Sequence, residues 1–307
     1  MSREPSGANK LTQISTTWNS IFVFILFIAG LLVVIPMILI IVVSFSSELS
    51  IANNGFTFFP SEWSLDGYKY LMKMGDQLLD SYIITIIHTI TGTVMSLAAM
   101  TMYAYVIAQP NFKHGKFLTW ILFFTMLFGG GLVPSYILNV RYLGINDSIW
   151  IFILPSLVNA YHTIILRTFI RTTIPEALFD AARIDGAGHF RAFTSIGLPL
   201  LKPGIATIGL FSLVSRWNNW FTGMLYIQNP KLVPLQTLLT KIQDSISFLK
   251  QNAEIAGTPD GILLLRNLPD ENLRMACTLA VIVPMLFAYP FFQRYFVQGL
   301  TLGSIKD

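Results

Sequence analysis

Side chains able to carry out catalysis are few and dispersed in this sequence. The four histidines are isolated from one another: His88, His114, His162 and His189. A single cysteine, Cys277, excludes a disulfide framework and a cysteine-rich metal site. The nucleotide-binding pattern G-x-x-x-x-G-K-[ST] is missing, because the only Gly-Lys pair, Gly115-Lys116, is followed by Phe117. The sequence therefore predicts no catalytic residues, no metal site and no cofactor bound by this chain.

One group of polar residues is unusual because it lies inside an apolar stretch, Gly204 to Ile227. Its members recur every three or four residues, as on one face of a helix: Ser212, Ser215, Arg216, Asn219, Gly223 and Tyr226. An arginine inside a bilayer is costly unless it meets water or a partner. Three settings meet this requirement for Arg216: carbonyl groups of a neighbouring subunit, an aqueous cavity, or a bound substrate. The candidate pathway or substrate residues are Ser212, Arg216, Asn219, Trp220 and Tyr226.

The composition places these residues in a membrane protein. The chain is 53% hydrophobic and 12% charged, and its mean hydropathy is +0.61. Soluble proteins carry roughly 25% charged residues, so this chain cannot cover a water-facing surface of its size and a soluble globular enzyme is excluded. The net charge of +4 comes from scattered single residues rather than a basic patch, which argues against nucleic acid as a partner.

Six uncharged stretches are long enough to span a bilayer, for which a helix needs roughly 20 apolar residues. They are Ile21 to Phe45, Ser81 to Ala108, Phe117 to Val140, Ser148 to Leu166, Gly204 to Ile227 and Met275 to Gln293. The first is too long for a signal peptide and lacks a clean cleavage site, so we interpret it as a helix. The predicted fold is an all-α integral membrane protein with six transmembrane helices.

The distribution of Lys and Arg predicts the orientation of these helices. Loops on the amino-terminal side hold eleven basic and five acidic residues, whereas the opposite side holds eight basic and eleven acidic residues. Because basic residues concentrate in cytoplasmic loops, both termini are predicted to be cytoplasmic. Residues 1–20 then form a cytoplasmic segment, and residues 21–307 form a single transmembrane domain. Its two long loops are a cytoplasmic one at 167–203 and an external one at 228–274.

The cytoplasmic loop contains a pattern typical of a short surface helix between Thr172 and Ala187. Thr173 can cap its start, Pro175 suits the first turn, and Gly186 can end it in a left-handed conformation. Small residues on one face would let another surface approach closely. Two interpretations fit these residues, a helix that docks on a partner protein and an amphipathic helix that rests on lipid headgroups.

The same loop resembles a known family. The run Asp180-Ala181-Ala182-Arg183-Ile184-Asp185-Gly186-Ala187, followed by Ile196, Leu198-Pro199 and Pro203, resembles the EAA loop of permease subunits in bacterial binding-protein-dependent ABC importers. One position departs from the motif, since Asp180 stands where the family has glutamate. Four further motifs resemble the carbohydrate-uptake branch, in particular permeases for oligosaccharides and polysaccharide fragments. They are Phe128 to Tyr136, Leu166 to Phe169, Arg216 to Trp220 and Val233 to Gln236.

The resemblance implies a function and a set of partners. The EAA helix would seat on an ATPase and couple it to transport through Glu176, Asp180, Ala181, Ala182, Arg183, Asp185 and Gly186. The implied partners are a second homologous permease, two copies of a cytoplasmic ABC ATPase that carries ATP and Mg, and an extracellular sugar-binding protein, expected to be a lipoprotein. The implied location is the bacterial plasma membrane, where lipid surrounds the helices.

The external loop is the place where the resemblance puts the contact with the loaded binding protein. Leu238, Leu239, Ile242 and Ile246 follow helical spacing there, and a polar tip runs from Gln251 to Gly261. The alternative is a lid packed on the helix ends. In the third predicted span, Gly129-Gly130-Gly131 with Pro134 weakens the helix, which suits either a gating hinge or close packing against the partner permease.

Two other classes of protein compete with this interpretation. An ion-coupled secondary transporter or channel working without an ATPase usually needs a buried Asp or Glu, and none of the sixteen acidic residues lies well inside a predicted span. A structural membrane scaffold would have no use for a docking helix together with an arginine inside the membrane.

Overall fold

The computed structural model describes residues 15–251 and 270–302. Within those ranges the regular structure is helical, and the β contacts amount to one isolated bridge between Ser46 and Trp63. The chain forms two compact units, the first comprising Met1–Tyr70 with Asn267–Leu279 and the second comprising Leu71–Arg266 with Ala280–Asp307. The prediction that the chain is all-helical is confirmed for the described residues.

The first unit begins with the long apolar helix α1 (Thr16–Ser44), whose N-cap is Ser15. A short helix α2 (Glu48–Asn54) and most of α3 (Asp66–Lys73) follow, and the unit also includes the first turns of α16 (Glu271–Leu302). The apolar side chains of α1 remain exposed over most of its length, and its buried residues are Val43 and Ser44 at the end. A helix that is apolar on every side suits a lipid environment.

Asn272 joins the segments of this first unit. Its side-chain amide donates to the carbonyls of Ser44 at 3.0 Å and Ser46 at 2.6 Å, and its Oδ1 accepts from the backbone N–H of Gly67 at 2.6 Å. A Cβ at Gly67 would lie 2.1 Å from that oxygen, so glycine is required for this approach. The Glu48 carboxylate accepts from the first backbone N–H groups of α16, where the helix dipole favours negative charge.

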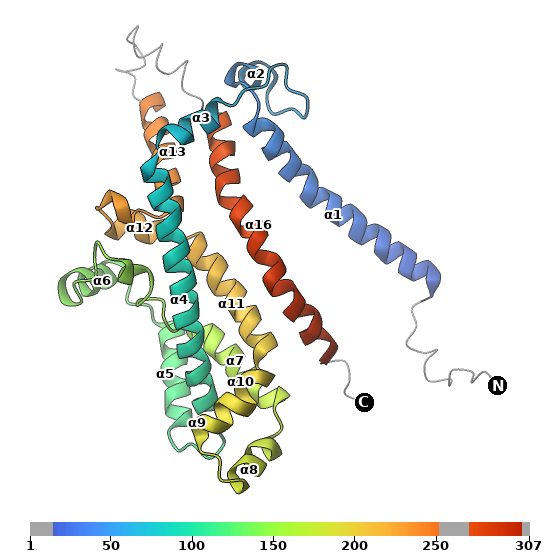
Figure 1. Cartoon of the computed structure of the whole chain (residues 1–307), viewed down its shortest axis with the longest axis vertical. Coiled ribbons are helices and arrows are strands. Elements are labelled where there is room, and N and C mark those ends of the chain that lie inside the picture. The colour runs from blue at the N-terminus through green and yellow to red at the C-terminus, as the bar shows by residue number, and fades with distance from the viewer. Residues whose placement is uncertain (1–14, 252–269, 303–307) are drawn as a thin grey trace. The chain divides into compact units, whose positions relative to one another are not determined.

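The second unit is built around α4 (Asp76–Ala108), which packs against α7 (Ala160–Thr173) and α11 (Lys202–Trp217) (Figure 1). Helices α8 (Glu176–Ile184) and α9 (His189–Ala192) lie at one end of α4, and α13 (Leu235–Gln251) lies at the other. Helix α5 (Gly115–Leu127) runs beside α4 and α7. Small side chains on α4, such as Ala104 and Ala108, allow its neighbours to approach closely.

Three of the six predicted spans are interrupted, whereas only the third was expected to be weakened within its length. The third consists of α5, α6 (Leu132–Ile137) and the π-helical turn η2 (Leu138–Tyr142), with a bend of 114° between its two halves. Three consecutive glycines at the bend remove side-chain contacts and favour conformations outside the helix, and Gly131 has φ of +85°. The glycine-rich weakening expected there is a complete break.

The fourth and fifth predicted spans are interrupted as well. The fourth has a single 3-10 turn, η3 (Ile149–Phe152), followed by irregular chain up to Asn159 and then α7. The fifth ends at Trp217 and resumes as α12 (Phe221–Tyr226). At that break the Asn219 amide accepts from the backbone N–H of Thr222 at 3.2 Å, so the asparagine competes with the helical hydrogen-bond pattern.

Three helices of the described chain are long and apolar enough to cross a membrane: α1, α4 and the part of α16 from Glu271 to Phe291. Counting each sharply bent helix pair as one span raises the number to at most five. The multi-pass character of the chain is therefore evident, whereas six spans and the position of the termini remain predictions.

The predicted loop at 228–274 contains the helix that its apolar spacing predicted. On α13, Leu238, Leu239, Ile242 and Ile246 are buried, which confirms that they share one face. The backbone N–H of Leu235 donates to the Thr85 hydroxyl at 2.8 Å and ties the start of α13 to α4. The predicted polar tip from Gln251 to Gly261 lies, beyond its first residue, outside the described residues.

Candidate functional site

The cytoplasmic loop of the sequence analysis forms a distinct helix, α8, but its start differs from the expectation. Thr173 is the last residue of α7 rather than a cap, and Pro175 occupies the N-cap position with an extended backbone. Proline restricts the residue before it to extended conformations, so Ile174 ends α7 and the chain turns before α8 begins. Glu176 lies in the first turn of α8, where its negative charge complements the helix dipole.

The carboxyl end of α8 is a left-handed turn at Gly186, as predicted. Gly186 has φ of +78°, its N–H donates to the carbonyl of Arg183 at 3.0 Å, and the N–H of Ala187 donates to that of Ala182 at 2.8 Å. This pair of bonds is a Schellman motif, which satisfies two carbonyls at the helix end. The chain can reverse here because glycine adopts a positive φ without the penalty that a Cβ brings.

The inner face of α8 is part of the hydrophobic core of the second unit. Phe179 and Ala182 are buried in one apolar cluster with residues of α4, α7 and α11. The Phe179 ring meets the Tyr105 ring edge-on, with 5.7 Å between the ring centroids. Ala182 was expected to help dock a partner, but its small side chain faces the chain's own core. Movement of α8 is consequently coupled to the long helices through direct packing.

Three arginines bind the carboxyl end of α4 to this loop. Arg167 and Arg171, both on α7, donate to the carbonyls of Ile107 and Ala108 at 3.2 to 3.5 Å. Arg183 on α8 donates to the Gln109 side chain at 3.4 Å and pairs with Asp180 at 3.1 Å. The carboxyl end of a helix carries partial negative charge that cations neutralise. This capping role of Arg167 was not predicted from the sequence, where the residue is only part of the run Leu166 to Phe169.

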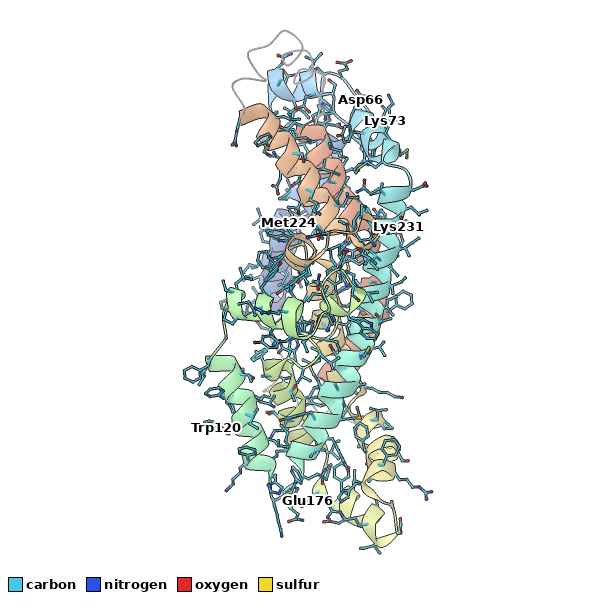
Figure 2. The ribbon with its side chains drawn as sticks, turned by 90° about the vertical axis from the view of Figure 1, so that its left-hand side faces the viewer. Asp66, Lys73, Trp120, Glu176, Met224 and Lys231 are labelled. Carbon is cyan, nitrogen blue, oxygen red and sulfur yellow. The ribbon has the colours of Figure 1, made fainter. Side chains whose placement is uncertain are left out.

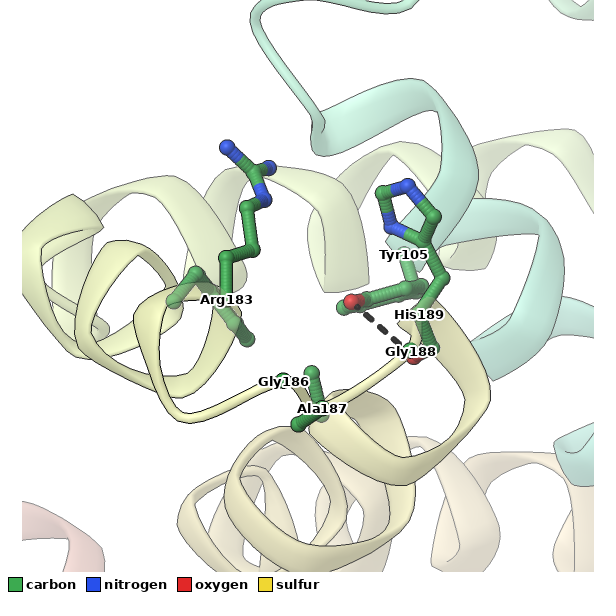
Figure 3. Close-up of a pocket in the computed structure, with 8 residues that line it drawn as sticks. Tyr105, Arg183, Gly186, Ala187, Gly188 and His189 are labelled. Carbon is green, nitrogen blue, oxygen red and sulfur yellow. Dashed lines mark hydrogen bonds between the residues drawn. The ribbon is translucent and has the colours of Figure 1, made fainter.

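The outer face of α8 is exposed, and it carries six of the seven predicted coupling residues: Glu176, Asp180, Ala181, Arg183, Asp185 and Gly186. Glu176 lies at the same end of the second unit as the turn between α4 and α5, and Trp120 on α5 points outward (Figure 2). Beside α8, a cavity of about 320 Å³ is lined by Tyr105, Arg183, His189 and the backbone at Gly186 to Gly188 (Figure 3). At this end of the second unit, the exposed and charged face of α8 therefore lies next to a cavity, and its opposite face is packed in the hydrophobic core.

The candidate pathway residues do not form one continuous stripe, because α11 ends at Trp217. Arg216 is only 6% exposed, and its guanidinium donates to the carbonyls of Phe152 and Ser156 and to the Ser96 hydroxyl. The acceptors thus belong to the same chain, whereas the sequence analysis considered carbonyls of a neighbouring subunit, a cavity or a substrate. The irregular chain after η3 leaves carbonyls free of helical bonding, and these attract the guanidinium.

The other four candidates are distributed between the interior and the surface. Ser212 is buried on α11, and the Asn219 side chain, just before the N-cap residue Trp220, bonds to the N–H and the hydroxyl of Thr222 in α12. Trp220 is 43% exposed. Tyr226 stacks on Tyr136 of α6 with 5.4 Å between ring centroids, and its hydroxyl accepts from the Asn139 amide at 3.3 Å. A role for these residues in the pathway stays a prediction.

The second unit thus consists of broken apolar helices packed on the long helix α4, with the exposed helix α8 at one end. Residues 100–302 match the family "Binding-protein-dependent transport system inner membrane component". The chain belongs to this family, and it is a multi-pass permease subunit of an ABC importer in the plasma membrane. The ion-coupled transporter or channel receives no support from these matches.

The chain is also similar to individual proteins over nearly its full length. It is 34% identical to the polygalacturonan/rhamnogalacturonan transport system permease protein YtcP of Bacillus subtilis (strain 168), with 93% of this chain and 96% of the relative covered. It is 27% identical to the arabinooligosaccharides transport system permease protein AraQ of Halalkalibacterium halodurans, with 93% and 94% covered.

A solved structure has the same fold. The crystal structure of a bacterial ABC transporter involved in the import of the acidic polysaccharide alginate contains a chain with a TM-score of 0.75 and 29% identity. The match covers 96% of this chain and 100% of that chain. Membership of the family implies that this permease works with a partner permease, an ATPase and a binding protein.

Proposed function

We propose that this permease subunit translocates oligosaccharides or polysaccharide fragments that an extracellular binding protein delivers. The names of its relatives support this substrate class, since they refer to polygalacturonan, rhamnogalacturonan and arabinooligosaccharides. The structural neighbour's title, which names alginate, agrees with it. Mass spectrometry of the ligand carried by the cognate binding protein would test the class directly, and a non-carbohydrate ligand would overturn it.

The coupling site of this proposal is the outer face of α8. One observation carries it: charged residues from Glu176 to Asp185 are exposed on a helix whose opposite face is fixed in the core through Phe179. A partner that presses on α8 therefore moves α4, α7 and α11 with it. We infer that two copies of an ABC ATPase, which hold ATP and Mg, serve the permease pair and that one of them seats on this helix.

The proposed topology has six spans with both termini in the cytoplasm. The excess of basic residues on the α8 side supports this orientation. The breaks in the third, fourth and fifth proposed spans then fall at the membrane level, where irregular backbone must be buried in protein or line a water-filled space. We further propose that the binding protein is a lipoprotein and meets the end of the second unit that carries α13.

An experiment on the assembled transporter tests coupling and substrate together. Membrane vesicles that contain both permeases, the ATPase and the loaded binding protein should take up labelled oligosaccharide only when ATP is present. Asp185→Lys should reduce the ATPase that copurifies with a tagged permease, because it reverses charge on the exposed face, while sugar binding by the isolated binding protein stays unchanged. Full retention of the ATPase by this variant would contradict the coupling site.

A further inference from the structure

The central helix α4 carries a row of buried polar groups that lack hydrogen-bond partners. Among residues 15–251 and 270–302, the unpartnered buried side-chain atoms belong to five residues, and all five lie on α4: Ser81, His88, Thr89, Thr93 and Thr101. Each is at most 6% exposed. Leaving a buried polar group without a partner costs about 1 to 3 kcal/mol. A row of such groups on one helix therefore calls for a partner that this conformation does not supply.

His88 is the most informative member of the row. A threonine hydroxyl can bond to the carbonyl four residues earlier in its own helix, as Thr85 does to Ser81 at 2.7 Å. The imidazole of His88 has no such local solution, because both ring nitrogens need partners and neither has one. Its ring stacks on Phe152 with 4.7 Å between centroids, so packing holds it in place. Polar side chains inside membrane segments are expensive and usually functional.

The Arg216 guanidinium packs against α4 midway along this row. The guanidinium lies over Gly92, where an added Cβ would come within 2.6 Å of Nη1 and 2.9 Å of Cζ. Gly92 is one helical turn from both His88 and Ser96, and Ser96 accepts a hydrogen bond from Nη2. The same guanidinium donates to the carbonyls of Phe152 and Ser156. It thus joins α11, α4 and the irregular chain after η3 across the row.

We propose that the face of α4 from His88 to Thr93 is a hydrophilic part of the transport pathway, closed in this conformation, and that Arg216 in its Gly92 notch is the latch. When α11 separates from α4, the guanidinium leaves the notch, and the imidazole and hydroxyls bind water or the hydroxyls of a passing sugar. This inference rests on the proposed function as an oligosaccharide permease. It explains why polar atoms are retained where apolar ones would pack without cost.

Thiol accessibility in the assembled transporter tests the proposal. Thr93→Cys is compared with Val94→Cys, its neighbour on the outer face at 61% exposed, both in a Cys277→Ser background. A small charged methanethiosulfonate reagent is applied without nucleotide and again with ATP, vanadate and the loaded binding protein. The Thr93 thiol should react at least tenfold faster in one condition than in the other. The Val94 thiol should stay slow in both, since a thiol in hydrocarbon does not ionise.

Equal rates for the Thr93 thiol in the two conditions, whether slow or fast, would overturn the proposal. Ser96→Ala tests the latch, because it removes one acceptor of Arg216 and should raise the Thr93 rate without nucleotide by up to about tenfold. If Val94 accelerates to the same degree, the helices have merely loosened and the latch is refuted. Uptake of labelled oligosaccharide by the same Cys277→Ser vesicles tests the proposed function separately. If uptake is normal and the Thr93 thiol reacts in neither condition, the hydrophilic face is refuted and the proposed function is not.

Discussion

At the scale of single residues, Gly186 shows how one backbone conformation defines the end of a helix, in this case α8. An added Cβ at Gly186 would meet no atom within 4 Å, so a substitution there is penalised by the positive φ alone. A left-handed conformation costs a branched residue roughly 1 to 2 kcal/mol, whereas asparagine tolerates it. The side chain's shape, rather than its contacts, should therefore decide the effect of a substitution.

We predict that Gly186→Val inserts normally and pairs with the second permease, but loses most ATPase retention and uptake because the end of α8 is displaced. Gly186→Asn should keep both activities near the wild-type level. Copurification of the ATPase with a tagged variant measures the effect. Wild-type retention by Gly186→Val would mean that the loop is passive.

Arg216 gives a second prediction at this scale. Arg216→Met would remove three buried hydrogen bonds to a charged group, although the Phe152 and Ser156 carbonyls would keep bonds from the Ser156 and Ser96 hydroxyls, so the stability of the complex should fall by about 2 kcal/mol. Arg216→Lys should recover part of this loss, because one ammonium keeps the charge but lacks the planar fork that reaches several acceptors. In thermal melting followed by size-exclusion chromatography, the melting temperature should fall in the order wild type, Arg216→Lys, Arg216→Met. An unchanged melting temperature for Arg216→Met would rule out this structural role.

Gly186 and Arg216 also show what could and what could not be predicted from the sequence alone. Gly186 was assigned its left-handed turn from local spacing, because the helix-ending signal involves only neighbouring residues. The partners of Arg216 come from 60 and 120 positions away in the sequence, at Ser156 and Ser96. No local pattern identifies them. The burial of Ala182 was missed for the same reason, since the core that covers it is assembled from helices far apart in the sequence, including α4, α7 and α11.

At the scale of elements, α8 is held by one aromatic anchor. Phe179→Ala should destabilise the second unit by about 3 kcal/mol, because it removes a buried ring from the core cluster. Ile184→Ala is the matched control on the same helix, as Ile184 is 86% exposed and its truncation should leave the melting temperature unchanged. Differential melting of the two purified variants measures this. Equal melting temperatures would show that α8 is not anchored through Phe179.

Among the elements, the interruptions within the predicted spans were the features least predictable from the sequence. The end of α4 at Ala108 and the buried face of α13 followed from apolar spacing, whereas α4 begins at Asp76, five residues before the predicted start at Ser81. The interruptions in the third, fourth and fifth predicted spans did not follow from apolar spacing, because a run of apolar residues has the same composition whether it forms one helix or two. Glycines gave a local signal for the first break. At the break after Trp217, the Asn219 side chain accepts from the backbone N–H of Thr222 in the first turn of α12, a bond that no apolar pattern predicts.

At the scale of the whole molecule, the orientation in the membrane can be measured. In a Cys277→Ser background, Ser245→Cys on α13 should react with an impermeant thiol reagent in intact spheroplasts. Asn111→Cys, in the turn between α4 and α5, should react only after the membrane is opened. Both positions are exposed, so access to the reagent depends on the side of the membrane. The opposite pattern would invert the topology and remove α8 from the cytoplasm.

The break between α5 and α6 has a consequence for the life of the protein in the cell. Residues 128–131 are exposed and non-helical, and they follow a helix of 13 residues that rises roughly 20 Å from its start, within a hydrocarbon layer of about 30 Å. Peptide groups cannot face lipid there without losing hydrogen bonds to water. We predict that the partner permease covers these peptide groups, so that membrane quality control recognises a newly made subunit that lacks its partner. Pulse-chase labelling should give the chain a shorter half-life when the second permease is deleted than when both are synthesised together.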